Sequence, residues 1–253
     1  MKRIVLSVLM LTAAISLSAQ TGFHAGAQFT FNGVFIHKQN SYGFSEMDYE
    51  MKFGVAPGLA FGYNFDENNG VQVEFNYATM GQNYYDKIPD FSISTGNNNP
   101  KVDTYRKIGL NYFQIPIMYR FQTERKKKKN AVFHLMGGPS VGILLGAEQT
   151  WEADIANDGV LVDVTDVVPQ AIPGFDASTA DKDYFNSIDV GLQLAVGTSI
   201  FINDQLFITP ELRMYYGFVD INSEDTRDLY NDFEFSRNAA VGISVGIHYL
   251  TQE

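Results

Sequence analysis

The stretch from Leu110 to Phe121 reads Leu-Asn-Tyr-Phe-Gln-Ile-Pro-Ile-Met-Tyr-Arg-Phe, and its side chains alternate in character. From Phe113 onward every second residue is apolar or aromatic, whereas the residues between them are Gln114, Pro116, Met118 and Arg120. A period of two is typical of a β-strand with two different faces. The run is longer than the usual soluble strand of about 5–6 residues. It fits a strand that crosses a bilayer in roughly 9–11 residues, with aromatic side chains at the lipid–water boundary. Because Pro116 cannot donate a ladder hydrogen bond, we expect a bulge or a strained register there.

Seven further segments alternate in the same way, so the sequence predicts eight strands. Their ranges, with the quoted stretch extended to its expected start, are 22–35, 51–65, 71–84, 105–121, 131–147, 184–201, 206–219 and 237–250. The connections after the second, fourth and sixth strands are short, whereas those at 36–50, 85–104, 148–183 and 220–236 are long. This rhythm indicates an all-β fold, an eight-stranded antiparallel transmembrane β-barrel with short periplasmic turns and long extracellular loops.

The second face of these strands decides which side of the barrel meets lipid. In the segment 51–65 it carries Gly54, Ala56, Gly58, Ala60 and Gly62. A soluble eight-stranded barrel of the lipocalin type would instead place its apolar face inside and a polar face in water. Small residues suit a narrow lumen, so we expect the bulky residues to face lipid.

The N-terminus has the composition of an export signal. Lys2 and Arg3 precede an apolar run that is too short for a spanning helix, and small residues follow at Ser18 and Ala19. We expect residues 1–19 to be a signal peptide, with cleavage after Ser18 as the alternative, and residues 20–253 to form one outer membrane β-barrel domain. The chain contains no Cys and carries a formal net charge of −11. That acidity argues against nucleic acid as a partner.

Five charged residues fall on the small-residue face, namely Lys52, Glu74, Arg120, Glu211 and Arg213. Isolated charges inside a narrow barrel are costly, so they should pair. An eight-stranded barrel leaves room for little more than side chains. We therefore predict a lumenal charge network that fills the barrel, with a polar solute path as the alternative.

The third long loop is rich in carboxylates, including Glu152, Asp154, Asp158, Asp163 and Asp166. Their spacing does not match a calcium-binding loop. We interpret them as a soluble loop held off the anionic lipopolysaccharide surface, with a cation-binding loop as the alternative. Trp151 and the run Val160 to Val162 indicate that part of this loop is ordered, as a strand extension above the membrane.

Catalytic and metal-binding motifs are weak. His24, His37, His134 and His248 lack zinc spacing, so we predict no metal site and no cofactor. Gly242-Ile243-Ser244-Val245-Gly246 matches Gly-x-Ser-x-Gly, but a nucleophile elbow needs a strand-to-helix turn at the Ser. Here the pattern lies inside a strand, and Ser244 is one of its small lumenal residues. We predict that the protein is not an enzyme.

Residues 104–121, with Tyr112-Phe113-Gln114-Ile115-Pro116-Ile117-Met118-Tyr119, resemble the central motif of the PorT-like outer-membrane β-barrel family of Bacteroidetes. Phe75-Asn76-Tyr77 with Gly81 is similar to that family's third strand, and 210–217 is similar to its seventh. The resemblance implies a barrel in the cell outer membrane. Gln114 stands where the family usually has Glu, so a role for that carboxylate does not transfer.

Two function classes follow. The first is a structural or interaction component of the cell envelope, accessory to secretion or envelope assembly, with lipid, lipopolysaccharide and an envelope protein as partners. The second is a small porin-like or solute-binding transport barrel.

Overall fold

The computed structural model describes residues 22–38, 47–89, 100–125, 130–165, 181–224 and 235–251. The expected signal peptide, residues 1–19, lies outside these ranges. Within them the long strands are β1 (Gly22–His37), β3 (Lys52–Asn64), β4 (Asn69–Pro89), β5 (Lys101–Gln122), β6 (Ala131–Ala153), β8 (Ile188–Phe201), β9 (Leu206–Gly217) and β10 (Arg237–Leu250). The short elements are β2 (Asp48–Glu50), β7 (Val162–Asp163) and the 3-10 turn η2 (Asp181–Tyr184). No helix in the described ranges is long and apolar enough to cross a membrane.

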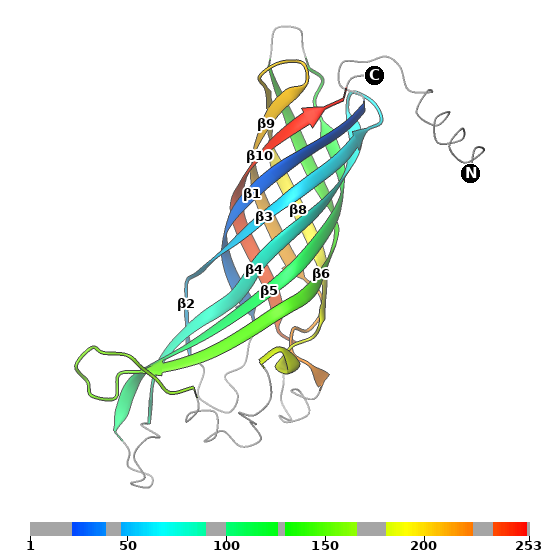
Figure 1. Cartoon of the computed structure of the whole chain (residues 1–253). Helices are drawn as coiled ribbons and strands as arrows, with labels where there is room; N and C mark the ends of the chain where they lie inside the picture. Colours follow the sequence, from blue (N-terminus) through cyan, green and yellow to red (C-terminus); the bar gives the residue numbers. More distant parts are fainter. Residues whose placement is uncertain are drawn as a thin grey trace, which may run out of the picture.

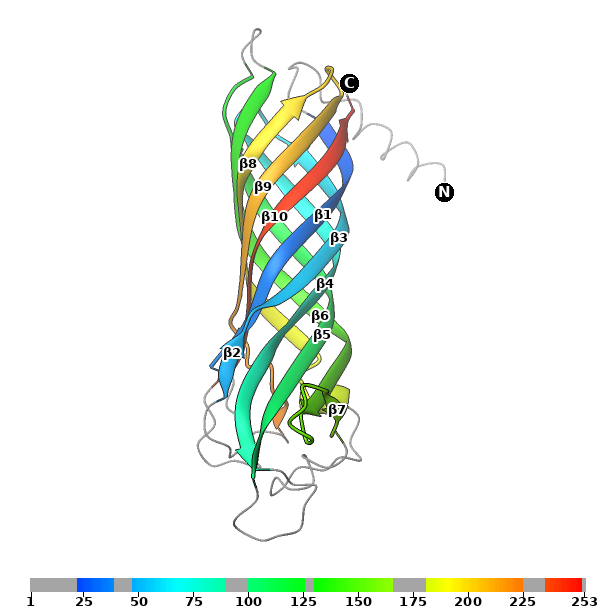
Figure 2. The same cartoon turned by 90° about the vertical axis from the view of Figure 1, so that its left-hand side faces the viewer.

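The eight long strands close into a ring in the order β4-β3-β1-β10-β9-β8-β6-β5, and β5 pairs again with β4 (Figures 1 and 2). Every pairing in the ring is antiparallel. β1 begins and β10 ends at the same end of the barrel, where the amide of Thr251 donates to the carbonyl of Phe23 (2.8 Å). The predicted all-β barrel is therefore confirmed. Closure pairs the backbone within the sheet, which a strand needs if it is to cross hydrocarbon.

The alternation of the strands produces the two faces that the sequence predicts. Phe29 and Phe31 of β1 are each 51% exposed on the outside, whereas Gln28 and Thr30 between them are buried inside. Outside, Ile243 of β10 is 66% exposed beside Phe31. Bulky side chains thus form the lipid-facing band, and small or polar ones fill the lumen.

The bulge or strained register expected at Pro116 is absent from the β5–β6 pair at that residue, and the irregularity of this pair lies nearer the start of β5. Pro116 stays in register with Ser140 of β6, and the register shift in the β5–β6 pair falls between Asn111 and Tyr112. There, Leu145 of β6 is left over between the partners of these two residues. The proline lacks a ladder donor without forcing an extra residue into the strand, whereas the bulge lies where the lipid-facing band ends.

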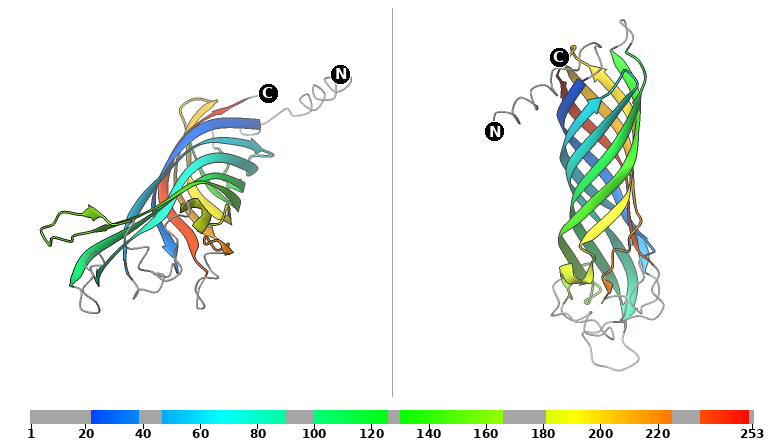
Figure 3. Two further views of the ribbon diagram at one scale, coloured as in Figure 1. Left: turned by 60° about the horizontal axis from the view of Figure 1, so that its bottom comes forward. Right: turned by 90° about the vertical axis from the view of Figure 1, so that its right-hand side faces the viewer.

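β4, β5 and β6 are longer than predicted and continue past the membrane, so part of the expected loops 85–104 and 148–183 is strand. The β4–β5 pairing runs on to Pro89 and Lys101, β2 pairs with β4, and β7 pairs with β6. Figure 3 shows this extension leaning away from the rest of the ring. The strand extension expected around Trp151 is confirmed. The outer part of the barrel consists of residues 82–89 of β4, 101–108 of β5 and 147–153 of β6, together with β2 and β7. We call this part the extracellular sheet.

The polarity of the two faces inverts in the extracellular sheet. In β5 the outer face carries Tyr105 and Lys107, whereas Ile108 and Arg106 are buried on the inner face. Water replaces lipid outside, so the apolar residues turn inward, as in a soluble sheet with one covered face. The buried apolar cluster at this end includes Val34, Ile36, Met47, Met80, Tyr84, Val102, Ile108, Leu110, Tyr112, Leu144, Trp151, Val164, Tyr184, Phe185, Tyr215 and Ile221. This cluster packs apolar side chains together at the extracellular end of the barrel.

Gly81 marks the start of this extension in β4. Its φ is +133°, a backbone conformation that residues with a side chain rarely adopt, and it pairs with Gly109. A Cβ atom at Gly81 would lie 2.0 Å from the carbonyl oxygen of Ile108. Glycine is therefore needed here for both backbone conformation and space.

Candidate functional site

The centre of the lumen is occupied by an arginine held between two carboxylates. Arg213 of β9 reaches Glu74 of β4, which lies diametrically opposite in the ring. Its Nη1 donates to Glu74 Oε2 (2.7 Å) and its Nη2 to Glu74 Oε1 (2.8 Å). Its Nε also donates to Oε2 of Glu211, two residues before it (2.7 Å). These bonds join opposite walls of the barrel.

Amide side chains complete the shell of Glu74. Gln28 and Asn76 donate to its Oε2 (2.6 and 3.0 Å), and Gln72 donates to its Oε1 (2.7 Å). Glu74 has 0% exposure, so its charge depends entirely on these partners and on Arg213. A buried carboxylate needs this full set of hydrogen bonds and an opposite charge, because nothing else offsets the free-energy cost of removing it from water.

Arg120 of β5 joins the network through intermediates and not by a direct ion pair with Glu211. Its Nη2 donates to Ser199 Oγ (2.6 Å), Ser199 Oγ lies 3.2 Å from His134 Nδ1, and His134 Nε2 lies 3.0 Å from Glu211 Oε1. Its Nη1 also donates to Gln72 Oε1 (3.4 Å). Two arginines and two glutamates thus share one connected set of hydrogen bonds. Its formal charges balance.

Lys52, which the sequence groups with these four charges, lies elsewhere. It opens β3 and faces Val34 across the strand pair, near the extracellular end. Its Nζ donates to the carbonyl oxygen of Ile108 (2.7 Å). Strand alternation assigns a residue to the inner face but does not give its height along the barrel, which the register decides.

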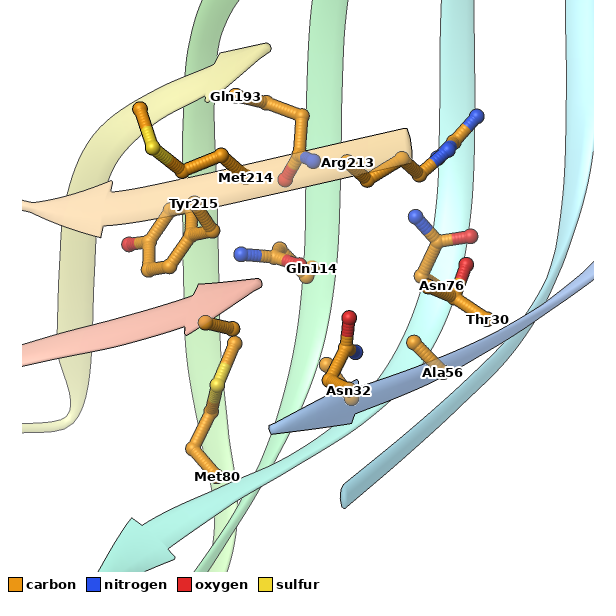
Figure 4. A pocket seen from close by; sticks show the side chains of 12 residues that line it. Thr30, Asn32, Ala56, Asn76, Met80, Gln114, Gln193, Arg213, Met214 and Tyr215 are labelled. Atoms are coloured by element: carbon orange, nitrogen blue, oxygen red, sulfur yellow. The ribbon is translucent and has the colours of Figure 1, made fainter. Parts of the chain in front are cut away.

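A small cavity lies beside the network (Figure 4). Its polar lining includes Thr30, Asn32, Asn76, Gln114, Gln193 and Arg213. The water-accessible space is about 20 Å³, and one water needs roughly 10–15 Å³ on this measure. Gln114 therefore lines a space for water and adds no charge.

The lumen is also closed toward the periplasm. Val132, Phe201, Phe207 and Leu250 form a buried apolar cluster at the end where the short turns lie. Next to it, the rings of Phe207 and His248 stack with centroids 5.0 Å apart. Together with the charge network and the extracellular cluster, this cap fills the barrel at three levels.

The carboxylates of the third loop serve the local fold. Glu152 pairs with Lys107 across β5 and β6 (2.7 Å), and Asp154 accepts from the amides of Asp158 and Gly159 (3.1 and 2.8 Å). Asp163 accepts from the hydroxyl of Thr165 (2.6 Å), which holds the pKa of that carboxyl below its usual range. Asp166 lies outside the described residues.

No three His, Cys, Asp or Glu side chains within the described ranges are grouped to hold a metal ion. His24, His134 and His248 are buried inside the barrel, as the alternation predicts. Ser244 is buried within β10, where it receives a hydrogen bond from Thr30 (3.0 Å). The strand continues past Ser244 to Leu250 without a strand-to-helix turn, so Ser244 does not have the geometry of a nucleophile elbow.

Sequence reasoning missed several members of the network. His134, Gln28, Gln72 and Ser199 all lie on the inner face, which alternation could indicate. Their contacts with the charged residues depend on register and on the opposition of β4 and β9. The inward apolar cluster of the extracellular sheet was also missed, although Ile108 and Leu110 continue the even-numbered face of the quoted stretch.

A closed ring of antiparallel strands with a lipid-facing apolar exterior and a filled polar interior defines an outer-membrane β-barrel protein. Residues 14–223 match the family described as outer membrane protein beta-barrel domain, and the chain belongs to that family. The protein is located in the cell outer membrane, embedded in its lipid and lipopolysaccharide.

Solved barrels resemble this chain in outline. The Neisserial surface protein A is 11% identical, with 90% of this chain and 97% of that chain covered and a TM-score of 0.39. OprG from Pseudomonas aeruginosa is 12% identical (92% and 98% covered, TM-score 0.39), and Ail of Yersinia pestis is 9% identical (90% and 99% covered, TM-score 0.33). The comparison with curated proteins found no match. The family match carries the assignment.

Proposed function

We propose that this protein is a closed, non-enzymatic barrel that anchors a rigid extracellular sheet for contact with another component of the cell envelope. The observation that supports this function is the filled lumen. The cross-barrel bonds of Arg213 to Glu74 lie between an apolar cap and an apolar mouth. A conducting pore needs a continuous wet path, and the side chains occupy that path.

The construction of the extracellular sheet supports a role in contact. Its inner face is a packed core in which Arg106 lies over the rings of Tyr84 (5.5 Å) and Trp151 (5.3 Å). Its outer face presents the paired rings of Tyr85 and Tyr105, with centroids 5.0 Å apart. Packed inner side chains keep these rings in place, and tyrosine is enriched at protein interfaces because it joins apolar area to a polar group.

The resemblance to the PorT-like family of Bacteroidetes supports an accessory role in secretion or envelope assembly. The quoted stretch from Tyr112 to Tyr119 carries that resemblance. We propose that residues 1–19 are a signal peptide, because a protein of the outer membrane must be exported.

Conductance tests the closed lumen. The purified full chain, reconstituted in a planar bilayer beside a known porin as positive control, should give no steady current steps. Reproducible ohmic steps from the wild-type chain would contradict the proposal and favour a small porin-like or solute-binding barrel.

Co-purification tests the contact surface. We expect proteins cross-linked to the barrel in native membranes to be recovered with wild type and lost with the double variant Tyr85→Ser, Tyr105→Ser. Tyr119→Ser is the matched control, because Tyr119 lies on the same outer face of β5 at the other end. Equal recovery from all three forms would show that the tyrosine pair is not the contact surface.

A further inference from the structure

The extracellular sheet ends at β7, a short edge strand. β7 pairs with β6, with Glu152 opposite Asp163 and Ala153 opposite Val162. Within the described residues it pairs with no other strand. Figure 2 shows β7 at the extracellular end of the barrel, beside β6. An edge strand exposes amides and carbonyls that can pair with another chain. In the part of the chain that the structure describes, the far edge of β7 is therefore free to accept a further strand.

The hydrogen bonds of the β6–β7 pair show which backbone groups of β7 point away from β6. The amide of Val164 donates to the carbonyl oxygen of Trp151 (2.9 Å), so the backbone of Val164 points toward β6. Backbone directions alternate along a strand, so Val162 also points toward β6, whereas Asp163 and the preceding Leu161 point away. The amides and carbonyls of these two residues form the outward edge.

Three consecutive aliphatic side chains are exposed at this edge. Val160, Leu161 and Val162 are 61%, 45% and 46% exposed, and they lie beyond the band that lipid covers. Exposed edges usually carry Lys or Pro, which prevent pairing with other chains. Residues 160–165 contain neither. Adjoining apolar side chains exposed to water are typical of a contact site.

The chain around β7 is held in shape before any partner binds. The carboxylate of Asp154 accepts hydrogen bonds from the amides of Asp158 and Gly159 (3.1 and 2.8 Å), in the turn that leads into β7. After β7, the hydroxyl of Thr165 accepts from the amide of Trp151 (3.0 Å). A preorganised edge loses little conformational entropy when a partner binds, which favours affinity.

The charge around this edge favours a basic partner. Asp158 and Asp163 are exposed, and neither forms an ion pair within the described residues. Lys107 of the same sheet pairs with Glu152 (2.7 Å), and residues 131–181 contain no Lys or Arg. A second copy of this chain would bring the same carboxylates to the edge, and the phosphate groups of lipopolysaccharide would be repelled as well. A segment that carries Lys or Arg would be attracted.

We propose that the outward edge of β7 binds an extended, basic segment of another envelope protein, which adds a strand to the extracellular sheet. The backbone of Leu161 and Asp163 pairs with that segment, and its Lys or Arg residues face Asp158 and Asp163. The exposed aliphatic side chains contact its apolar residues. Strand addition takes affinity from backbone hydrogen bonds and specificity from side chains. This binding mode rests on the contact role proposed above for the extracellular sheet and gives the partner a defined chemistry.

Fluorescence anisotropy of a labelled peptide tests the edge on the folded full chain in a non-ionic detergent. The probe is a short peptide of alternating Val and Lys, which can extend as a strand and carries positive charge. We expect saturable binding to wild type that weakens roughly tenfold or more in Leu161→Pro, because proline has no amide to donate and its ring obstructs the edge. Leu161→Ala, which keeps the amide, should lose less. Unchanged emission of Trp151 in Leu161→Pro would show that the β6–β7 pair is intact.

The role of charge is tested with Asp158→Asn and Asp163→Asn together. We expect this double variant to bind the peptide roughly tenfold more weakly or worse, because both attracting charges are removed. Asp48→Asn is the matched control, since it removes one carboxylate at the opposite edge of the same sheet, in β2, and it should bind as wild type does.

No saturable binding to wild type, or equal binding by wild type and Leu161→Pro, would overturn the proposal. A wild-type dimer in sedimentation equilibrium that is lost in Leu161→Pro would make a second copy the occupant and would overturn it as well. The tyrosine surface can fail separately. Peptide binding that persists in Tyr85→Ser, Tyr105→Ser, together with unchanged recovery of cross-linked proteins, would refute that surface and leave the edge of β7 as the contact.

Discussion

Replacing Arg213 with Met, Glu74 with Gln, and both together measures how strongly the two walls of the barrel are joined. Arg213 contacts Glu74 through two hydrogen bonds of 2.7 and 2.8 Å, and both side chains are buried. Arg213→Met leaves Glu74 and Glu211 with Arg120 as their remaining arginine. Glu74→Gln leaves the network with an excess positive charge.

The expected magnitudes follow from the charge balance. Each single change removes one partner of a buried pair, so each should cost roughly 3–5 kcal/mol of unfolding free energy. The double change removes one positive and one negative charge together and leaves Arg120 and Glu211 as a balanced set. We therefore expect the double variant to cost about as much as one single variant, a coupling of roughly 3–5 kcal/mol.

Urea unfolding in detergent micelles, followed by far-UV circular dichroism, provides the four free energies. Fluorescence of Trp151, the single Trp, is a second probe, because it is buried in the extracellular sheet and reports whether that part unfolds with the barrel. Glu211→Gln with Arg120→Met is the matched comparison. Its coupling should be smaller, because His134 and Ser199 stand between the two charges. Additive losses of roughly 6–10 kcal/mol for Arg213→Met with Glu74→Gln would refute the reasoning.

Three further predictions concern the rest of the barrel. Leu212→Arg, placed in the lipid-facing band where Leu212 pairs with Ile243, should cost roughly 2–4 kcal/mol in urea unfolding, whereas Tyr249→Arg near the periplasmic boundary should cost about 0–1; equal costs would contradict this placement. Gly81→Ala should cost roughly 1–3 kcal/mol by the same measurement because of its positive φ, with Gly146→Ala, which has open space, as the neutral control. The hydroxyl of Tyr85, and then Lys87, hold the pKa of Asp103 below its usual range, so this carboxylate should favour the folded state above its ordinary pKa of about 3.9 and lose that effect as the pH falls through the lowered value. Tyr85→Phe should raise the pKa of Asp103 in a ¹³C carboxyl titration, and an unchanged value would show that the hydroxyl does not bind it.

The class of fold was predictable from the sequence because lipid imposes a local rule. Every strand that crosses hydrocarbon must alternate and must be long, so Phe29 and Phe31 reveal their outward direction without knowledge of their neighbours. The same rule placed Glu74, Arg120, Glu211 and Arg213 on the inner face. It also placed Lys52 there, although Lys52 lies at the mouth and not in the network.

Contacts across the lumen were decided only by the tertiary structure. The bond between Arg213 and Glu74 requires that β9 and β4 face each other in a closed ring, and ring closure is a property of all eight strands together. Asn238 of β10 and Asp189 of β8 meet for the same reason, since neither residue carries a local pattern that names its partner. Alternation therefore determined which residues point inward, whereas register and closure decided which of them touch, because those distances depend on the whole barrel.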